Sequence, residues 1–313
     1  MYTEFIFDNP PFASCHAATI ASTSRGLISA WFAGEEEGSP DVGIWISENE
    51  GSGWSQPREV ATGLEENGRI CACWNPVLFS AAGDPTMLFY KVGRSPRSWW
   101  GRLMTSGDGG RNWSQSLRLP ANFLGPIKNK PVKLEDGTLL CGSSSEQKGW
   151  TVHMEMTTDL GGSWTRTESL NDGRRLAAIQ PTILSFPSGE LRILCRTRQG
   201  KIAESRSQDQ GRSWSKMQLI SLPNPDSGID GTVLQDSRAL LVYNHSMAER
   251  YPLNVSISSD GNSWSMVLTL EDGEGEYSYP AVIQSPDGIV HIVYTWNRSR
   301  IKHVIIDPKE IGR

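Results

Sequence analysis

Two segments of the chain hold residues that could perform acid–base and nucleophilic chemistry. Asp41 and Glu36 lie in a long polar stretch after an apolar run, and Glu276 directly precedes Tyr277. Glycoside hydrolysis needs a proton donor and a nucleophile or base on opposite sides of the sugar. A tyrosine can be that nucleophile where a carboxylate helps to remove its proton. Neighbouring strand residues usually point to opposite faces, so the assisting carboxylate stays open among four residues: Glu276, Glu274, Asp230 and Glu146.

A second set of residues is cationic, although the net charge of the whole chain is −5. The set comprises Lys91, Lys128, Lys130, Arg196 and Arg250. An arginine suits a carboxylate because its planar guanidinium binds both oxygens. Gathered around one opening, these cations predict an anionic ligand. The alternative is that they form ordinary surface ion pairs, which contribute little to stability.

A repeated turn supplies the elements that must position these side chains. A small hydroxyl residue, an Asp, a Gly and a Trp recur at intervals of about 50 to 60 residues. The copies are Ser47–Trp54 (with Asn for Asp), Ser106–Trp113, Thr157–Trp164, Ser207–Trp214 and Ser258–Trp264. Asp and Ser side chains bond to nearby backbone amides, Gly adopts a positive φ, and the Trp packs onto the sheet. Five copies at this spacing predict a repeat architecture.

Between the turns, each unit reads as four short strands bounded by turn residues. Inner strands are expected to begin near Ala17, Pro76, Pro131, Pro181, Gly231 and Pro280. Six beginnings predict an all-β, six-bladed β-propeller that occupies residues 1–313 as a single domain. The last unit lacks its fourth strand, and we expect the N-terminal run Glu4–Phe7 to supply it and close the ring.

In such blades the inner-strand beginnings and the loops between second and third strands share one face, with the repeated turns on the other. Loops on a rigid scaffold commonly carry the functional site, and a central concavity is the default pocket. The predicted site residues on this face, besides those above, are His16, Trp74, Asn75, Gln180, His245 and Tyr279.

Composition and motifs exclude several other functions. The acidic net charge gives no reason to expect nucleic acid or a membrane surface as partner. The N-terminus shows no signal peptide, which favours the cytoplasm, and the five cysteines are expected to be buried free thiols. The histidines have no metal-ligand spacing. We therefore expect no metal and no cofactor.

The turn S-x-D-x-G-x-x-W resembles the Asp-box, or BNR repeat, of the sialidase (neuraminidase) superfamily, and six blades agree with that fold. The resemblance covers nearly the whole chain and is greatest to bacterial and plant sialidase-like proteins. It implies that Asp41 is the acid/base and that Tyr277, in Glu276-Tyr277-Ser278, is the nucleophile. It also implies that Arg196 (or Arg198) and Arg250 bind the substrate carboxylate.

The sequence departs from that family in the first blade. The place of the first carboxylate-binding arginine reads Ser14-Cys15-His16-Ala17, and Glu36 stands where a further arginine usually precedes the acid. The hypothesis is an exo-acting glycoside hydrolase for an acidic sugar, sialic-acid-like or uronic. Two alternatives remain: a polysaccharide lyase or other glycosidase that uses His16 or His245 as base, and a non-catalytic glycan-binding propeller.

Overall fold

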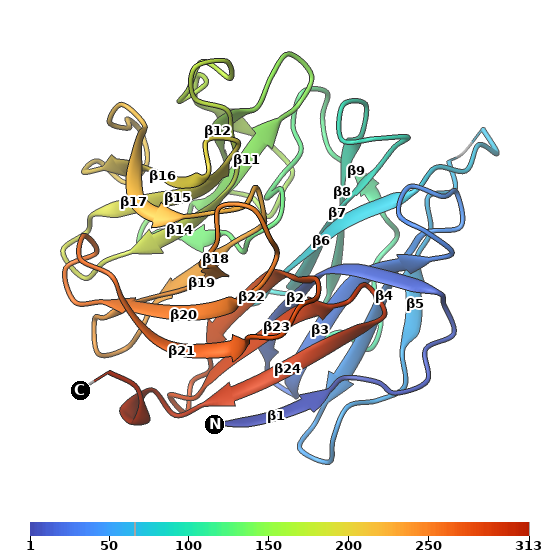
Figure 1. Cartoon of the computed structure of the whole chain (residues 1–313). Coiled ribbons are helices and arrows are strands. Elements are labelled where there is room, and N and C mark those ends of the chain that lie inside the picture. Colours follow the sequence, from blue (N-terminus) through green and yellow to red (C-terminus); the bar gives the residue numbers. More distant parts are fainter. Residues whose placement is uncertain (66, 313) are drawn as a thin grey trace.

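A computed structural model describes residues 1–65 and 67–312, and it consists of six four-stranded antiparallel sheets arranged as the blades of a β-propeller (Figure 1). The predicted all-β, six-bladed fold is therefore confirmed. The only helical element in the described residues is the short 3-10 helix η1 (Pro308–Glu310).

Each blade takes four strands that follow one another in the sequence, except the last. Blade 1 contains β2 (Ser14–Thr23), β3 (Gly26–Gly34), β4 (Gly43–Asn49) and β5 (Arg58–Ala61). Blade 2 contains β6 (Cys73–Phe79), β7 (Thr86–Val92), β8 (Trp100–Ser106) and β9 (Leu117–Arg118). Blade 3 contains β10 (Val132–Lys133), β11 (Leu139–Ser145), β12 (Thr151–Thr157) and β13 (Thr165–Arg166). Blade 4 contains β14 (Ala178–Ser185), β15 (Leu191–Thr197), β16 (Lys201–Ser207) and β17 (Gln218–Pro223). Blade 5 contains β18 (Asp230–Val233), β19 (Ala239–Asn244), β20 (Leu253–Ser258) and β21 (Ser265–Glu271).

The sixth blade joins the two ends of the chain. It contains β22 (Tyr277–Gln284), β23 (Val290–Trp296) and β24 (Arg300–Ile306), and β1 (Tyr2–Phe5) completes it. Figure 1 shows the blue strand β1 beside the red strand β24, with Tyr2 opposite Ile305 and Phe5 opposite Lys302. The predicted closure by the N-terminal strand is confirmed, and it leaves no long unpaired edge between the first and last blades.

The Asp-box turns are held by their own side chains. In the blade 2 copy, the Gly110 backbone N–H donates to Ser106 Oγ at 2.8 Å, and the Asn112 N–H donates to Asp108 Oδ1 at 2.9 Å. The hydrogen bonds that Asp108 accepts from the Asn112 backbone and side chain and from the Ser106 hydroxyl lower its pKa to about 2. The turns follow the third strands, away from the inner-strand beginnings, so they stabilise the blades and leave the opposite face free for a site.

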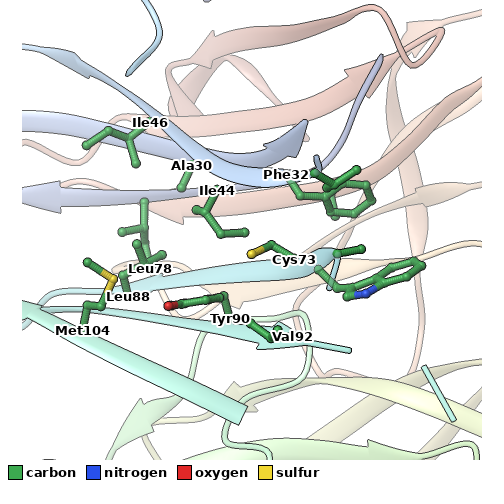
Figure 2. Close-up of a cluster of buried hydrophobic side chains, with 14 of the residues drawn as sticks. Ala30, Phe32, Ile44, Ile46, Cys73, Leu78, Leu88, Tyr90, Val92 and Met104 are labelled. Atoms are coloured by element: carbon green, nitrogen blue, oxygen red, sulfur yellow. The ribbon is translucent and has the colours of Figure 1, made fainter. Parts of the chain in front are cut away.

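The hydrophobic core lies between neighbouring blades. The second strand of every blade is buried along nearly its whole length, because a blade covers each of its two faces. Figure 2 shows the layer between blades 1 and 2, where Ile44 and Ile46 from β4 meet Leu88 and Tyr90 from β7. This burial explains why the second strands are the most apolar parts of each repeat.

Four of the six inner strands carry the same β-bulge near their beginnings. In β2, β6, β14 and β22 two residues oppose a single residue of the next strand. The first bulged residue has a positive φ in each case: Ala17 (57°), Asn75 (38°), Gln180 (56°) and Tyr279 (53°). Pro follows three of these four residues and needs no ladder donor. A bulge re-aims side chains, so these four positions depart from regular strand alternation on the side of the predicted site.

A hydrogen-bonded chain of two histidines supports the closing blade. His291 Nδ1 and His303 Nε2 are 3.0 Å apart, His291 Nε2 lies 3.1 Å from Ser285 Oγ, and His303 Nδ1 lies 3.0 Å from Glu4 Oε1 on β1. Burial, with a smaller effect of His303, lowers the pKa of His291 to about 4. Burial also lowers the pKa of His303, against the opposing effect of Glu4.

This pair predicts a loss of stability in mild acid. Between pH 6.5 and about 4 the unfolded chain protonates His291 and the folded chain does not, so the free energy of unfolding should fall as pH falls. The variant His291→Gln should show a shallower pH dependence over that window in chemical denaturation. An unchanged slope in the variant would contradict this role of His291.

Candidate functional site

Tyr279 is the centre of a cluster of charged side chains at the beginnings of the inner strands. Its hydroxyl accepts hydrogen bonds from Arg196 Nη1 at 2.7 Å and from Gln180 Nε2 at 3.3 Å. The imidazole of His16 lies against the phenol ring, with the ring centroids 4.2 Å apart. The bulge in β22 places Tyr279 here, and the bulge in β14 places Gln180 beside it.

Three cations, Arg196 among them, lie near the phenol ring. Arg196 Cζ lies 5.6 Å from the ring centroid, Arg250 Cζ 5.8 Å and Lys128 Nζ 5.8 Å. Cations at this distance are attracted to the electron-rich ring face. We call Tyr279, His16, Arg196, Arg250, Arg298, Lys128 and Glu276 the axial cluster. Its members come from blades 1, 3, 4, 5 and 6.

The outer part of the axial cluster is a carboxylate held between two guanidinium groups. Glu276 accepts from Arg250 Nη1 at 2.7 Å and from Arg298 Nε at 2.9 and 3.0 Å. The side chains of Glu276, Arg250 and Arg298 are 30%, 28% and 32% exposed, so ligands can reach this layer. Burial alone would raise the pKa of Glu276, but the Arg298 hydrogen bonds and the charge of Arg250 outweigh it and lower that pKa.

The inner part of the axial cluster is buried. Arg196 is paired with Asp226 and donates from Nε to Asp226 Oδ1 at 3.0 Å. Lys128 donates to Asn129 Oδ1 at 2.8 Å and to the carbonyls of Ile229 and Pro280. Burial lowers the pKa of Lys128 to about 7. The ammonium group therefore ties blades 3, 5 and 6 together at the floor of the cluster.

His16 is neutral in this environment. Burial, followed by the positive charges of Arg298, Arg250, Arg196 and Lys128, lowers its pKa well below the ordinary value. Its Nδ1 lies 3.1 Å from Thr295 Oγ1, which fixes the ring orientation. A neutral imidazole beside a phenol can accept or relay a proton.

Several predicted residues make structural contacts outside the axial cluster. Trp74 donates from Nε1 to the Gly93 carbonyl at 2.8 Å, and Asn75 donates to the Ile127 carbonyl at 3.3 Å; both side chains are buried.

Asp230 binds Lys130 Nζ at 3.0 Å. Lys130 also lines a cavity of about 660 Å³, together with the ends of inner strands and an Asp-box turn. Lys91 is fully buried and donates to the Pro126 carbonyl.

Four further predicted residues lie outside the axial cluster. Tyr277 is buried among apolar side chains between blades 5 and 6, and its hydroxyl donates to the Glu274 carbonyl at 3.4 Å. Asp41 is exposed and accepts from the Glu35 backbone N–H at 2.7 Å. Glu36 and His245 are also exposed. The bulge after Ser278 separates Tyr277 from Tyr279, although regular alternation would place both on one face.

Sequence reasoning missed Arg298, Asp226 and Trp150. Arg298 lies between β23 and β24, and its carbonyl accepts from the Cys15 backbone N–H at 2.7 Å, next to the first-blade position that lacks the family arginine. Arg298 therefore supplies a third arginine from blade 6. Its place in the loop between the second and third strands of blade 6 was the feature of the sequence that could have identified it as a site residue. Trp150 stacks under Arg196 and Arg198, at 5.2 and 4.1 Å.

The described residues contain no group of three or more His, Cys, Asp or Glu side chains arranged to hold a metal ion. No helix in the described part of the chain is long and apolar enough to cross a membrane. All five cysteines are free and buried.

The fold and the repeated turns define the class of protein: a six-bladed propeller with Asp-box turns. Residues 25–292 match the family model described as "BNR repeat-like domain", so the chain belongs to the BNR repeat-like family. The resemblance to the sialidase superfamily is thereby confirmed.

Solved structures with the same fold are distant in sequence. A Dyadobacter fermentans protein of unknown function aligns with a TM-score of 0.81 at 15% identity, over 97% of both chains. The NanB sialidase of Streptococcus pneumoniae gives 0.79 at 13% identity, over 96% of this chain and 69% of that one. The intramolecular trans-sialidase of Ruminococcus gnavus, solved with oseltamivir carboxylate, gives 0.75 at 14% identity, over 97% of both chains. No curated protein sequence matches the chain.

The electrostatics of the axial cluster predict how His16 titrates. Its imidazole should stay neutral well below pH 6.5 in an NMR titration of the histidine side chains, because burial and four cations oppose protonation. Arg298→Gln removes the largest of the cationic effects and should move the midpoint upward. Arg25→Gln, which breaks only an exposed ion pair with Glu50, is the control. A wild-type midpoint at or above 6.5 would show that the cations do not act on His16.

Proposed function

We propose that the protein is an exo-acting glycoside hydrolase for a carboxylate-bearing sugar, sialic-acid-like or uronic, with Tyr279 as its nucleophile. The observation that supports this most is the Tyr279 hydroxyl, bound by Arg196 at 2.7 Å inside a ring of cations. The same cations suit the carboxylate of such a sugar. In this proposal Tyr279 takes the role that the family resemblance implied for Tyr277.

Arg250 and Arg298 bind the substrate carboxylate in this proposal. They hold the carboxylate of Glu276 in the ligand-free protein, and a planar guanidinium accepts a sugar carboxylate in the same bidentate way. The same arginines lower the pKa of Glu276, so in this proposal Glu276 balances their charge in the free protein and is not the proton donor.

Asp41 remains our proposal for the proton donor. It lies at the end of the exposed loop 35–41, whose Glu37 reaches Arg298 and whose Gly38 lies against the ring of Trp74. The loop therefore borders the axial cluster. Protonation of the leaving oxygen requires the Asp41 carboxyl to exchange its hydrogen bond with Glu35 N–H for one with the substrate.

A second function, a uronate lyase, is favoured by the neutral His16 packed 4.2 Å from the Tyr279 ring. In β-elimination a base removes the proton next to the carboxylate, the bond to the leaving oxygen breaks, and a carbon–carbon double bond forms. Cations stabilise the charge that develops on the carboxylate. The lyase product absorbs in the ultraviolet and the hydrolase product does not, so the product spectrum separates the two.

Two tyrosines on one strand provide a matched test. Tyr279→Phe should lower turnover of a fluorogenic aryl sialoside or uronide by at least ~1000-fold, because the nucleophile is lost. Tyr277→Phe should leave turnover within about threefold, because it removes one long hydrogen bond at 3.4 Å.

Retained turnover in Tyr279→Phe would remove this residue from the mechanism, and loss confined to Tyr277→Phe would restore the assignment made from the sequence. Binding of the sugar without turnover by any variant would identify a glycan-binding propeller instead.

A further inference from the structure

A second cavity, of about 790 Å³, lies between blades 2 and 3. Its walls are the end of blade 2 with the following segment 119–124, and the outer strands of blade 3. We call it the interblade groove. A volume of this size is in the range of small-molecule sites, and no residue of the axial cluster lines it.

The polar lining of the interblade groove is basic and hydroxyl-rich. Its charged residues are Arg118, Lys148, Arg166 and a single acid, Glu168. Arg166 and Lys148 are exposed; among the described residues neither has a carboxylate within salt-bridge distance, and Arg166 donates only to the Asn122 carbonyl at 3.1 Å. The uncharged polar residues are Ser98, Asn122, Ser145, Gln147, Thr151, Thr167 and Ser169. Hydroxyls, amides and unpaired cations suit an acidic sugar.

A built, buried dyad forms part of the groove wall. His153 is 5% exposed and Glu155 is fully buried, and His153 Nε2 lies 2.8 Å from Glu155 Oε1. Glu155 also accepts the backbone N–H groups of Leu124 at 3.0 Å and Gly125 at 2.7 Å. The carboxylate therefore fixes the orientation of the imidazole ring.

One loop separates the interblade groove from the axial cluster. The connection between β11 and β12 contributes Gln147 and Lys148 to the groove. The same connection carries Glu146, which accepts from Trp150 Nε1 at 3.0 Å, and Trp150 lies under Arg196. A chain of sugars that entered the axial cluster could therefore cross this loop into the groove.

We propose that the interblade groove is a second subsite for an acidic oligosaccharide, in which Lys148 and Arg166 bind a carboxylate several sugar units away from the axial cluster and His153 contacts the same sugar. The proposal rests on the proposed function for the identity of the ligand as an acidic glycan. It adds that the protein recognises more than the terminal sugar.

The test measures binding of three probes by isothermal titration calorimetry: a uronic-acid tetrasaccharide, its carboxyl-reduced form and the uronic-acid monosaccharide. The tetrasaccharide should bind at least ~10-fold more tightly than either other probe, as expected for added charge-assisted hydrogen bonds. Lys148→Glu with Arg166→Glu should abolish that advantage. His153→Gln, which keeps a donor for Glu155, should reduce it by ~3- to 10-fold.

Two controls separate this proposal from the function of the axial cluster. Arg212→Glu with Lys216→Glu makes the same charge change on exposed residues of blade 4 and should leave the advantage intact. Arg250→Gln should weaken the binding of all carboxylated probes while it preserves their ratio.

A tetrasaccharide advantage that is absent in the wild type, or that survives Lys148→Glu with Arg166→Glu, would overturn the groove proposal. Monosaccharide binding would still report on the axial cluster in either case, so the two proposals can fail separately.

Discussion

The structure depends on a backbone irregularity that is repeated four times at one level of the propeller. A regular inner strand would turn alternate side chains toward its neighbouring blades. The bulges in β2, β6, β14 and β22 break that alternation, and non-glycine residues accept a positive φ to form them. Such strain persists only where the surrounding structure enforces it. Here the buried second strands provide that rigidity, and the result is Tyr279 and Gln180 in contact with Arg196.

Concentrated positive charge is the second constraint, and the protein balances it with its own carboxylates. Arg196 is paired with Asp226, and Arg250 and Arg298 are paired with Glu276. Without these partners, cations grouped around one ring would repel one another at short range. The partly exposed carboxylates, Glu276 at 30% and Asp226 at 41%, are the ones that a ligand carboxylate can replace, whereas the buried Lys128 holds the blades in position. Binding and stability are thus assigned to different layers of the same cluster.

The fold was predictable from the sequence because its signals are local and repeated. The Asp-box turns, the prolines at the inner strands and the unpaired N-terminal run predicted six blades and their closure. The site was predictable in part: His16, Arg196, Arg250, Lys128 and Tyr279 were expected on one face and lie together.

Side-chain direction was not predictable, since it depends on where the strand ladder is interrupted. Tyr277 and Tyr279 are two residues apart, and only the bulge after Ser278 decides which one meets the cations. Arg298 lies in a loop where two consecutive residues, Asn297 and Arg298, have positive φ angles. No periodic sequence pattern predicts this loop conformation. Pro280, which directly follows Tyr279, was the one sequence feature that indicated the bulge in β22.

The central claim is that the axial cluster binds a sugar carboxylate over Tyr279. A crystal structure of the protein with a bound carboxylated monosaccharide tests it most directly. We expect the sugar carboxylate to replace Glu276 on Arg250 or Arg298, with the anomeric carbon ~3.5 Å or less from the Tyr279 hydroxyl. A sugar bound away from these arginines, or an undisturbed Glu276 beside a sugar that contacts Tyr277, would contradict the account.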